Sequence, residues 1–348
     1  DAWLPTRGEV RLIRRWTTGN ERLAPASLTE GGILFAGDNT LGLIKPTAEL
    51  PRWVWPHQLP EGAVFRPRAS AGIALCAGRR ELGAWRLDSG EPLWRQGAMR
   101  QIGVPCLDGD AVFYGDGHEL IALDLASGNQ RWSFPAIADT QISYAPAAAG
   151  DTILVGPGDG RVYALDRENG QPRWVLNRIE DWQYLRQLHS VGHVLVAGGY
   201  TEKLYGIDLA SGALLWTFNA GNFINSHHVA DDSAFLWSPT GWIYAIDVHS
   251  GEVRWRHQTT GYRGGPHDWA SLMAELTTLD GYLYALDLAN VLHILDQNKG
   301  EEIIRYTLPK PARPFVLPLT TQEVVFGGND GDLWLLDLRD APKPSAAS

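Results

Sequence analysis

The segment YGIDLASGALLW at 205–216 returns four more times along the chain with few changes. The other copies are YAIDVHSGEVRW at 244–255, YALDRENGQPRW at 163–174, IALDLASGNQRW at 121–132 and GAWRLDSGEPLW at 83–94. We call these five segments the repeat motif. An active site is built once, so a motif repeated at near-constant spacing indicates a modular scaffold. The tryptophans that end successive copies are 38, 42, 42 and 39 residues apart, which is typical of a four-stranded propeller blade or of a helix pair.

The segments that precede the repeat motif predict strands rather than helices. DAVFYGDGHELIALDL at 110–125 and DTILVGPGDGRVYALD at 151–166 each place two β-rich runs around a Gly/Asp turn, which is the pattern of a hairpin. The Ser-Gly or Asn-Gly of the motif adds another turn and strand, and a run such as ISYAPAAAG supplies a fourth strand. Because no stretch shows the long 3.6-residue period of paired helices, we expect an all-β propeller.

The predicted third strand of a blade can be counted eight times, from LGLIK at 41–45 to LWLLDL at 333–338. The sequence therefore predicts an eight-bladed β-propeller of four-stranded antiparallel blades. It forms a single domain over residues 1–339, followed by a disordered Pro/Ala/Ser tail at 340–348.

The two ends of the predicted domain complement each other. The last blade stops without a turn glycine or an outer strand, whereas GEVRLIRRW at 8–16 resembles the GEVRW that ends one copy of the repeat motif. We therefore expect residues 8–16 to complete the last blade and close the ring, which removes exposed strand edges. By the glycine count Leu12 takes the tryptophan position, but Trp16 is close by, so the register stays open.

Composition limits the classes of partner. The chain has 348 residues, 44% of them hydrophobic, and its 38 glycines and 21 prolines suit many tight turns. A net charge of −10 without a cluster of Lys or Arg argues against nucleic acid as a partner. No apolar run reaches the roughly 18 residues of a membrane span. Since the chain begins at Asp1, we expect a targeting segment outside this sequence, and membrane association only through such a segment. Separately, we expect the protein to be a monomer.

The residues of the repeat have expected structural roles. A tryptophan four residues after the turn glycine can bury its ring against the neighbouring blade. The aspartate before the turn can accept backbone N–H bonds and hold the turn. These predicted structural residues are Trp53, Trp94, Trp132, Trp174, Trp216, Trp255, Asp124, Asp166, Asp208 and Asp247. Three blades depart from the motif: blade 2 has Arg86 in place of the aspartate, blade 7 has Ile304 in place of the tryptophan, and blade 1 lacks the glycine. Either these blades make specialised contacts or their repeats have drifted in sequence.

The repeat motif, AxDxxTGxxxW in outline, resembles the repeats of the pyrroloquinoline quinone (PQQ) enzyme family and its non-catalytic relatives. The resemblance covers most of the chain and implies a bacterial propeller. Among its members are large quinoprotein alcohol dehydrogenases, the periplasmic propeller lipoprotein of outer-membrane β-barrel assembly, and extracytoplasmic sensor domains of bacterial Ser/Thr kinases. The resemblance therefore implies a periplasmic or cell-surface location.

An enzyme is not the preferred interpretation. The dehydrogenases of the family carry a vicinal cysteine pair and long insertions, whereas Cys76 and Cys106 are thirty residues apart and eight blades use nearly the whole chain. We expect two buried apolar cysteines, although a disulfide stays open. The Gly/Asp segments fit hairpin turns better than calcium loops, and the adjacent His227 and His228 point to opposite faces of a strand. We therefore predict no catalytic residue, no metal and no required cofactor; PQQ binding is conceivable but the residues do not support it.

Aligning the predicted inner strands of the eight blades with one another indicates a candidate binding site. In each blade, the residue just before the aligned position is expected to face the central channel. The polar ones form an arc of Arg66, Gln187, His227 and Glu275, which binds either a partner or small anionic ligand or only water.

The longest connection between strands, RHQTTGYRGGPHDWASL at 256–272, is a second part of the candidate site. Its Tyr262, Arg263, His267, Asp268 and Trp269 have the composition of an interaction hot spot. The alternative is a loop that packs over the channel mouth. We thus predict a non-catalytic binding platform, either an assembly scaffold or a receptor sensor domain, with a PQQ-dependent dehydrogenase as the alternative.

Overall fold

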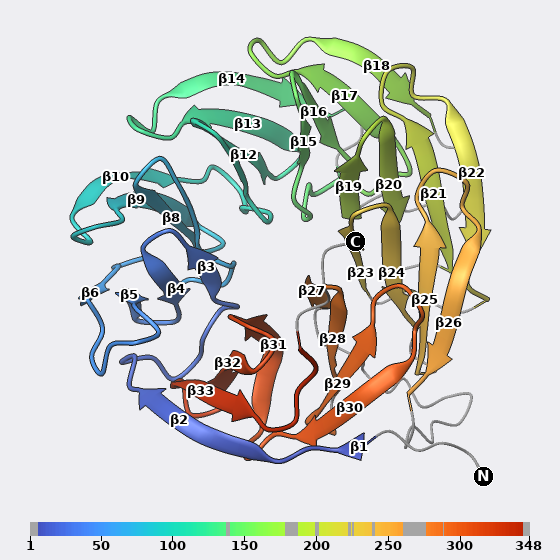
Figure 1. The fold of residues 1–348 in the computed structure, drawn as a ribbon. Coiled ribbons are helices and arrows are strands. Elements are labelled where there is room, and N and C mark those ends of the chain that lie inside the picture. Colours follow the sequence, from blue (N-terminus) through green and yellow to red (C-terminus); the bar gives the residue numbers. More distant parts are fainter. Residues whose placement is uncertain are drawn as a thin grey trace.

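The computed structural model describes residues 6–136, 140–177, 187–198, 202–221, 224, 226–238, 241–259, 276–287 and 289–343. The regular elements in this part of the chain are β-strands, and they form eight sheets arranged as the blades of a ring (Figure 1). The predicted eight-bladed propeller is therefore confirmed. Among the described residues there is no apolar helix of membrane-spanning length.

Each of blades 1 to 7 runs from the axis of the ring to its rim in chain order, and blade 8 does so for its first three strands. The innermost strands of blades 1 to 8 are β3 (Ser27–Thr29), β7 (Arg68–Ser70), β11 (Cys106–Asp108), β15 (Ala147–Ala149), β19 (Gln187–Val191), β23 (Ser226–Ala230), β27 (Thr277–Leu279) and β31 (Ala312–Pro318). The second strands are β4 (Gly32–Ala36), β8 (Ile73–Ala77), β12 (Ala111–Asp116), β16 (Thr152–Val155), β20 (Val194–Gly198), β24 (Ser233–Trp237), β28 (Tyr282–Leu286) and β32 (Glu323–Gly328). The third strands are β5 (Thr40–Ile44), β9 (Glu81–Arg86), β13 (Glu119–Asp124), β17 (Val162–Asp166), β21 (Lys203–Asp208), β25 (Trp242–Asp247), β29 (Val291–Asp296) and β33 (Leu333–Leu338). The outer strands are β6 (Trp53–Pro56), β10 (Pro92–Gly97), β14 (Gln130–Pro135), β18 (Pro172–Leu176), β22 (Leu214–Asn219), β26 (Val253–Gln258), β30 (Glu302–Thr307) and β2 (Val10–Trp16).

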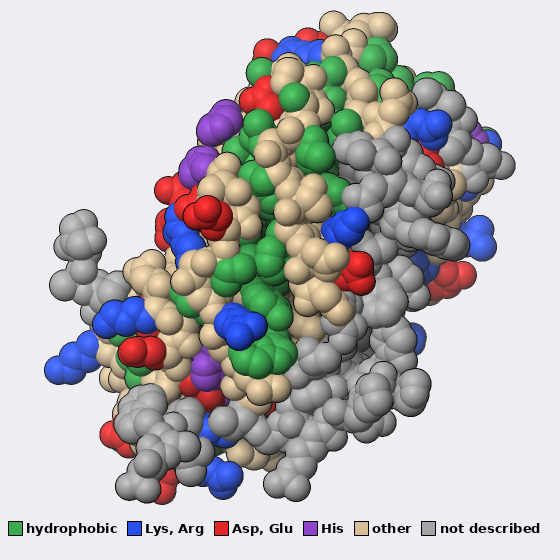
Figure 2. Space-filling view, turned by 90° about the vertical axis from the view of Figure 1, so that its right-hand side faces the viewer, with side chains coloured by type: hydrophobic (Ala, Val, Ile, Leu, Met, Phe, Trp, Pro, Cys, Tyr) green, Lys and Arg blue, Asp and Glu red, His purple; other side chains and the backbone are tan. Residues whose placement is uncertain are grey.

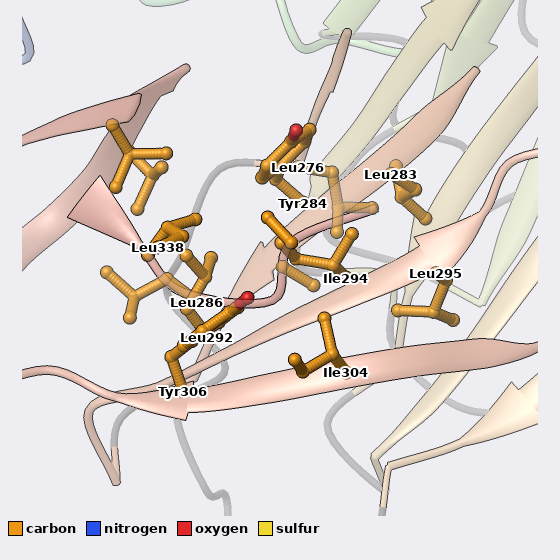
Figure 3. Close-up of a cluster of buried hydrophobic side chains, with 14 of the residues drawn as sticks. Leu276, Leu283, Tyr284, Leu286, Leu292, Ile294, Leu295, Ile304, Tyr306 and Leu338 are labelled. Atoms are coloured by element: carbon orange, nitrogen blue, oxygen red, sulfur yellow. The ribbon is translucent and has the colours of Figure 1, made fainter. Parts of the chain in front are cut away.

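The hydrophobic core lies between neighbouring blades. The second and third strands are almost wholly buried, because both faces of their sheets are covered by adjacent blades. Figure 3 shows the core around blade 7, where Tyr284, Leu292 and Tyr306 pack in one cluster with Leu338 of blade 8. The core is therefore shared around the ring, and each blade depends on its neighbours.

The N-terminal strand closes the ring, as predicted. Strand β2 pairs antiparallel with β33, so the outer strand of blade 8 comes from the start of the chain. A β-bulge settles the register: Leu12 lies opposite Leu336, and Arg14 lies opposite Leu335. The buried tryptophan of this strand is Trp16, while Leu12 is exposed.

A fifth strand on blade 7 was not predicted. Strand β1 (Thr6–Arg7) runs parallel to the outer strand β30, with Thr6 opposite Ile304. Residues 6–16 therefore span two blades, with β1 on blade 7 and β2 on blade 8 (Figure 1).

The tryptophans of the repeat join adjacent blades. Each indole N–H donates to a carbonyl in the next blade, one residue after the position of the repeat aspartate. The pairs are Trp53 to Leu87 (3.0 Å), Trp94 to Leu125 (2.7 Å), Trp132 to Arg167 (2.8 Å), Trp174 to Leu209 (2.9 Å), Trp216 to Val248 (2.8 Å) and Trp255 to Gln297 (2.9 Å). The turn glycine of the next blade lies under the ring: Gly251 has φ +75°, and a Cβ there would come within 2.7 Å of Trp216.

The repeat aspartates hold their turns from within. The carboxylate of Asp124 accepts a bond from the backbone N–H of Ser127, and Asp208 accepts one from the N–H of Ser211. The carboxylates of Asp166 and Asp247 accept from the N–H groups two and three residues further on. These bonds satisfy turn donors that would otherwise face solvent.

The departures from the repeat have structural counterparts. In blade 2 the guanidinium of Arg86 lies 3.2 Å from Glu91. In blade 7 the side chain that reaches the next blade is Tyr306, two residues beyond Ile304, and its hydroxyl donates to the Arg339 carbonyl at 2.7 Å. Gly8 of the chain start lies against this ring, where a Cβ would overlap it.

Blade 7 also contains a buried ionic network. Both ring nitrogens of His293 meet carboxylates, Nδ1 at 2.6 Å from Glu302 and Nε2 at 2.9 Å from Asp287. His257 of blade 6 lies 3.2 Å from the second oxygen of Glu302. Burial alone would lower the pKa of His293, but these hydrogen bonds raise it overall; burial alone would raise the pKa of Glu302, but its partners lower it to about 2.

Candidate functional site

The inner strands of blades 2, 5 and 6, which lie around the axis of the ring, carry several polar side chains. We call Arg66, Arg68, Gln187, His189, His227 and His228 the axial cluster. They lie on or beside β7 of blade 2, β19 of blade 5 and β23 of blade 6. Solvent reaches the inner strands, since Arg68 is exposed and Leu28 on β3 is 52% exposed.

Two histidines form the centre of the axial cluster. The Nδ1 atom of His189 lies 2.8 Å from Nε2 of His227, and the rings meet edge to face with centroids 4.6 Å apart. His227 is only 6% exposed, and its Nδ1 atom is buried without a partner among the described residues. The Oε1 atom of Gln187 is likewise buried without a hydrogen-bond partner among the described residues. Buried polar atoms without a partner are uncommon and each calls for a ligand or a water.

His228 faces the opposite side of its strand from His227. Its Nε2 atom lies 3.0 Å from the hydroxyl of Thr278 in blade 7. Burial, together with the charges of His189 and Arg66, lowers the pKa of His228 to about 4. Burial also lowers the pKa values of His189 and His227, so all three imidazoles are neutral near pH 7.

The two arginines of the axial cluster differ in exposure: Arg66 is half-buried, whereas Arg68 is exposed. Burial, with the nearby charge of Arg68, lowers the pKa of Arg66 to about 10. Burial also lowers the pKa of Arg68, opposed by the Cys106 thiol of blade 3. Both guanidinium groups still carry a charge near pH 7. The guanidinium of Arg68 makes no hydrogen bond or ion pair within the described ranges.

The structure places part of the predicted site in this cluster. Arg66, Gln187 and His227 of the predicted arc belong to it. Glu275 and the loop residues Tyr262, Arg263, His267, Asp268 and Trp269 lie outside the described residues. Sequence reasoning missed Arg68, His189 and His228, because it took one position per inner strand. The two-residue period of a strand was the available signal, since Arg68 and His189 follow Arg66 and Gln187 by two.

The described residues do not assemble a metal centre. No group of three or more His, Cys, Asp or Glu side chains in this part of the chain could hold a metal ion. Cys76 and Cys106 are free thiols, and burial raises their pKa values to about 12 and about 11. Thiols that stay protonated at neutral pH are poor nucleophiles.

Comparison with known proteins identifies the family. The family model of the outer membrane protein assembly factor BamB matches residues 78–218, 186–272 and 239–343. The chain belongs to the BamB family. No curated protein matches the sequence.

Solved structures extend the likeness of fold beyond the BamB family. BamB from Moraxella catarrhalis is 19% identical, with a TM-score of 0.70 over 94% of this chain and 100% of that one. The computationally designed Ika8 protein is 12% identical, with a TM-score of 0.80 over 94% of this chain and 99% of that one. The quinohemoprotein alcohol dehydrogenase ADHIIG from Pseudomonas putida HK5 is 10% identical, with a TM-score of 0.68 over 99% of this chain and 80% of that one. At these identities the likeness concerns the fold alone.

Proposed function

We propose that this chain is a non-catalytic scaffold that binds a protein partner outside the cytoplasm, in the assembly of outer-membrane proteins. The observation that carries the proposal is the match of the BamB family model to three overlapping segments of the chain. The absence of a vicinal cysteine pair from the sequence agrees with a binding role.

The outer strand of blade 5 is the contact surface that we favour. In blades 3, 4 and 6 an arginine on the outer strand pairs with the repeat aspartate: Arg131 with Asp124 (2.8 Å), Arg173 with Asp166 (2.8 Å) and Arg254 with Asp247 (2.5 Å). In blade 5 Leu215 takes the place of this arginine. Leu214 and Leu215 are 39% and 45% exposed, and the Asp208 carboxylate has no arginine partner among the described residues.

Strand β22 also offers an open edge. It lies at the end of its sheet, and its sequence LLWTFN has none of the charged side chains that usually protect an edge strand. Figure 2 shows hydrophobic side chains through the middle of this side of the molecule, with charged and histidine side chains to their left. A groove of about 630 Å³ between blades 4 and 5 is lined by apolar residues such as Trp174 and Leu209 and by polar ones such as Asp151. Leu209 and Ala210 of its lining lie in the connection that leads from β21 to β22.

The molecule itself contains an example of the proposed contact. Blade 7 has Ile303 where blades 3, 4 and 6 have the arginine, and its outer strand β30 is covered by β1. We infer that an extended segment of the partner pairs with β22 in the same manner, with a basic side chain near Asp208.

The experiment is co-purification of the tagged chain with the outer-membrane assembly complex of its own bacterium. Leu215→Arg gives blade 5 the arginine of its neighbours and should reduce the recovered complex at least fivefold. Leu93→Arg makes the same change at the equivalent position of blade 2 and should leave recovery unchanged. No co-purification of the unaltered chain would contradict the scaffold function.

The 256–272 loop stays a competing surface. An Arg263→Ala and Trp269→Ala double variant tests it, with circular dichroism as the control for folding. Loss of binding in this variant but not in Leu215→Arg would move the contact to the loop.

A sensor domain and a PQQ-dependent dehydrogenase are the alternatives. The chain supplied with PQQ and Ca²⁺ should not oxidise alcohols with an artificial electron acceptor. Turnover above a heat-inactivated control would make it an enzyme, whereas binding without turnover would favour the sensor.

A further inference from the structure

The groove between blades 4 and 5 lies where turns of the two blades meet. Its walls come from the turn between β15 and β16, the turn between β19 and β20, and the connection that follows β21. Five of the lining residues are small, namely Ala148, Ala149, Gly150, Gly192 and Ala210. Because such residues leave the space between the turns open, the groove keeps a volume of about 630 Å³, within the range of roughly 300–1,000 Å³ that is typical of ligand pockets.

The interface between blades 3 and 4 shows what fills the equivalent space. The residue after the repeat aspartate of blade 4 is Arg167, and its guanidinium crosses to the inner hairpin of blade 3. There it pairs with the Asp108 carboxylate, donates to the Asp108 carbonyl at 2.8 Å and lies 3.5 Å from Asp110. Asp110 also binds Arg131 of its own blade at 2.7 Å. One carboxylate is thus shared by two arginines, one from each blade.

The interface between blades 4 and 5 has only half of this arrangement. Asp151 takes the place of Asp110, because each directly precedes the second strand of its blade. Its own-blade arginine is Arg173, at 2.8 Å. The position that would bring the second arginine from the next blade holds Leu209, which has no side-chain donor. The Asp151 side chain is 77% exposed, and Arg173 is its one cationic partner in the part of the chain that the structure describes.

The charges beside the groove favour a cation. Arg173 is shared between Asp151 and Asp166, at 2.8 Å from each, so one negative charge of this trio is not balanced. Ala149 stands where blade 3 has Asp108, so the groove is open where that carboxylate would lie. A cationic side chain that enters the groove therefore meets the Asp151 carboxylate, as Arg167 meets that of Asp110.

The groove also offers an aromatic ring. Trp174 lines it from the outer strand of blade 4, and its indole N–H donates to the Leu209 carbonyl at 2.9 Å. Between blades 3 and 4 the guanidinium of Arg167 lies 5.5 Å from the centroid of the Phe113 ring. A planar guanidinium combines contact with a ring and paired hydrogen bonds to a carboxylate, whereas an ammonium group acts as a point charge. The groove therefore suits arginine better than lysine.

We propose that the groove between blades 4 and 5 binds an arginine side chain of the partner protein, paired with Asp151 and packed against Trp174. Leu209 and Ala210 of the lining lead into β22, so the site continues the contact surface of blade 5. This inference rests on the proposed function for the nature of the partner, whereas the preference for arginine rests on the groove itself.

The first test replaces the partner by N-acetyl-arginine amide, titrated into the whole chain at pH 7 and low ionic strength. The readout is the NMR signal of the Trp174 indole N–H, identified by its loss in Trp174→Phe, and we expect it to shift to saturation. N-acetyl-citrulline amide has nearly the same shape without the charge and should bind at least tenfold more weakly. Asp151→Asn should weaken binding of the arginine amide at least fivefold. The matched control is Asp110→Asn, which should leave binding unchanged because Arg167 already fills the space beside Asp110.

The second test fills the groove from within. Leu209→Arg gives blade 5 the residue that blade 4 has at the same position, and Leu209→Met is the uncharged control. Leu209→Arg should abolish binding of the arginine amide and reduce the recovered assembly complex at least fivefold, whereas Leu209→Met should change neither. Equal melting temperatures establish that both variants fold.

Failure of the site and failure of the scaffold function give different results. No saturable shift with the arginine amide, or equal binding of the citrulline amide, would remove the site even if the unaltered chain co-purifies with the complex. Equal weakening by Asp110→Asn would show general charge attraction and would also overturn the proposal. Saturable binding that depends on Asp151, without co-purification, would support the site and contradict the scaffold.

Discussion

The joint between blades 5 and 6 and the joint between blades 7 and 8 use different residues for the same contacts. In the first, Trp216 donates to the Val248 carbonyl and covers Gly251. In the second, Tyr306 donates to the Arg339 carbonyl and covers Gly8, which comes from the other end of the chain. These two joints thus share an aromatic donor, a turn carbonyl and a glycine, and the position that supplies each can move by up to two residues or change strands.

Removing the N-terminal strands breaks the second joint and should have the largest effect. Deletion of residues 1–16 takes away Gly8, β1 and β2, and leaves β30 and β33 as open edges. We expect a protein that aggregates or fails to fold, as measured by size-exclusion chromatography and thermal unfolding. A truncated protein as soluble and as stable as the whole chain would contradict the closure.

Truncation of a regular joint should be the next largest effect. Trp216→Ala removes a nearly buried ring and its hydrogen bond, and should lower the free energy of unfolding by about 3–5 kcal/mol. Denaturant titration measures this change. A loss below about 1 kcal/mol would mean that the repeat tryptophans do not join the blades.

The sequence predicted the regular joints better than the irregular ones. The motif ending at Trp216 predicts its contact because glycine, turn and tryptophan keep a fixed spacing. The bulge after Leu12 shifts the aromatic residue to Trp16, and bulges arise from pairing across strands that the local sequence does not contain. The axial cluster was found in part, since contacts such as that of His189 with His227 join residues 38 positions apart in different blades.

The ionic network beside the second joint should make stability depend on pH. The raised pKa of His293 gives stability that is complete below its ordinary value of 6.5 and is lost as pH rises through the folded-state value. The lowered pKa of Glu302 gives stability that is complete above 4.5 and is lost as pH falls toward about 2. We expect a plateau between these limits and losses on the order of 1–3 kcal/mol outside it.

Thermal unfolding across pH measures this dependence, with a His293→Gln and Glu302→Gln double variant as the control. The double variant should give a flatter profile if it folds. A profile of the unaltered protein without either decline would mean that the network contributes no pH dependence.

The smallest expected effects come from two substitutions that compare the two joints directly. Tyr306→Phe and Trp216→Phe each keep an aromatic ring and remove one hydrogen bond to a carbonyl. Loss of the hydroxyl of Tyr306 should cost about 1 kcal/mol. Trp216→Phe should cost more than Tyr306→Phe, because it also reduces the size of the ring. The reverse order in denaturant titration would show that the two joints are not equivalent.

The pairing of β2 with β33 also sets the order in which the molecule can fold. Val10 lies opposite Leu338, so a strand that precedes blade 1 in the chain pairs with the third strand of blade 8. Contacts between such distant parts of a chain form slowly, because the intervening chain must be ordered first. During that interval we expect blades 1 to 7 to form an open arc with unpaired edges, a kind of species that is prone to aggregation. We expect the speed of this pairing step to set how long the unpaired edges of β33 and of the neighbouring outer strands stay exposed.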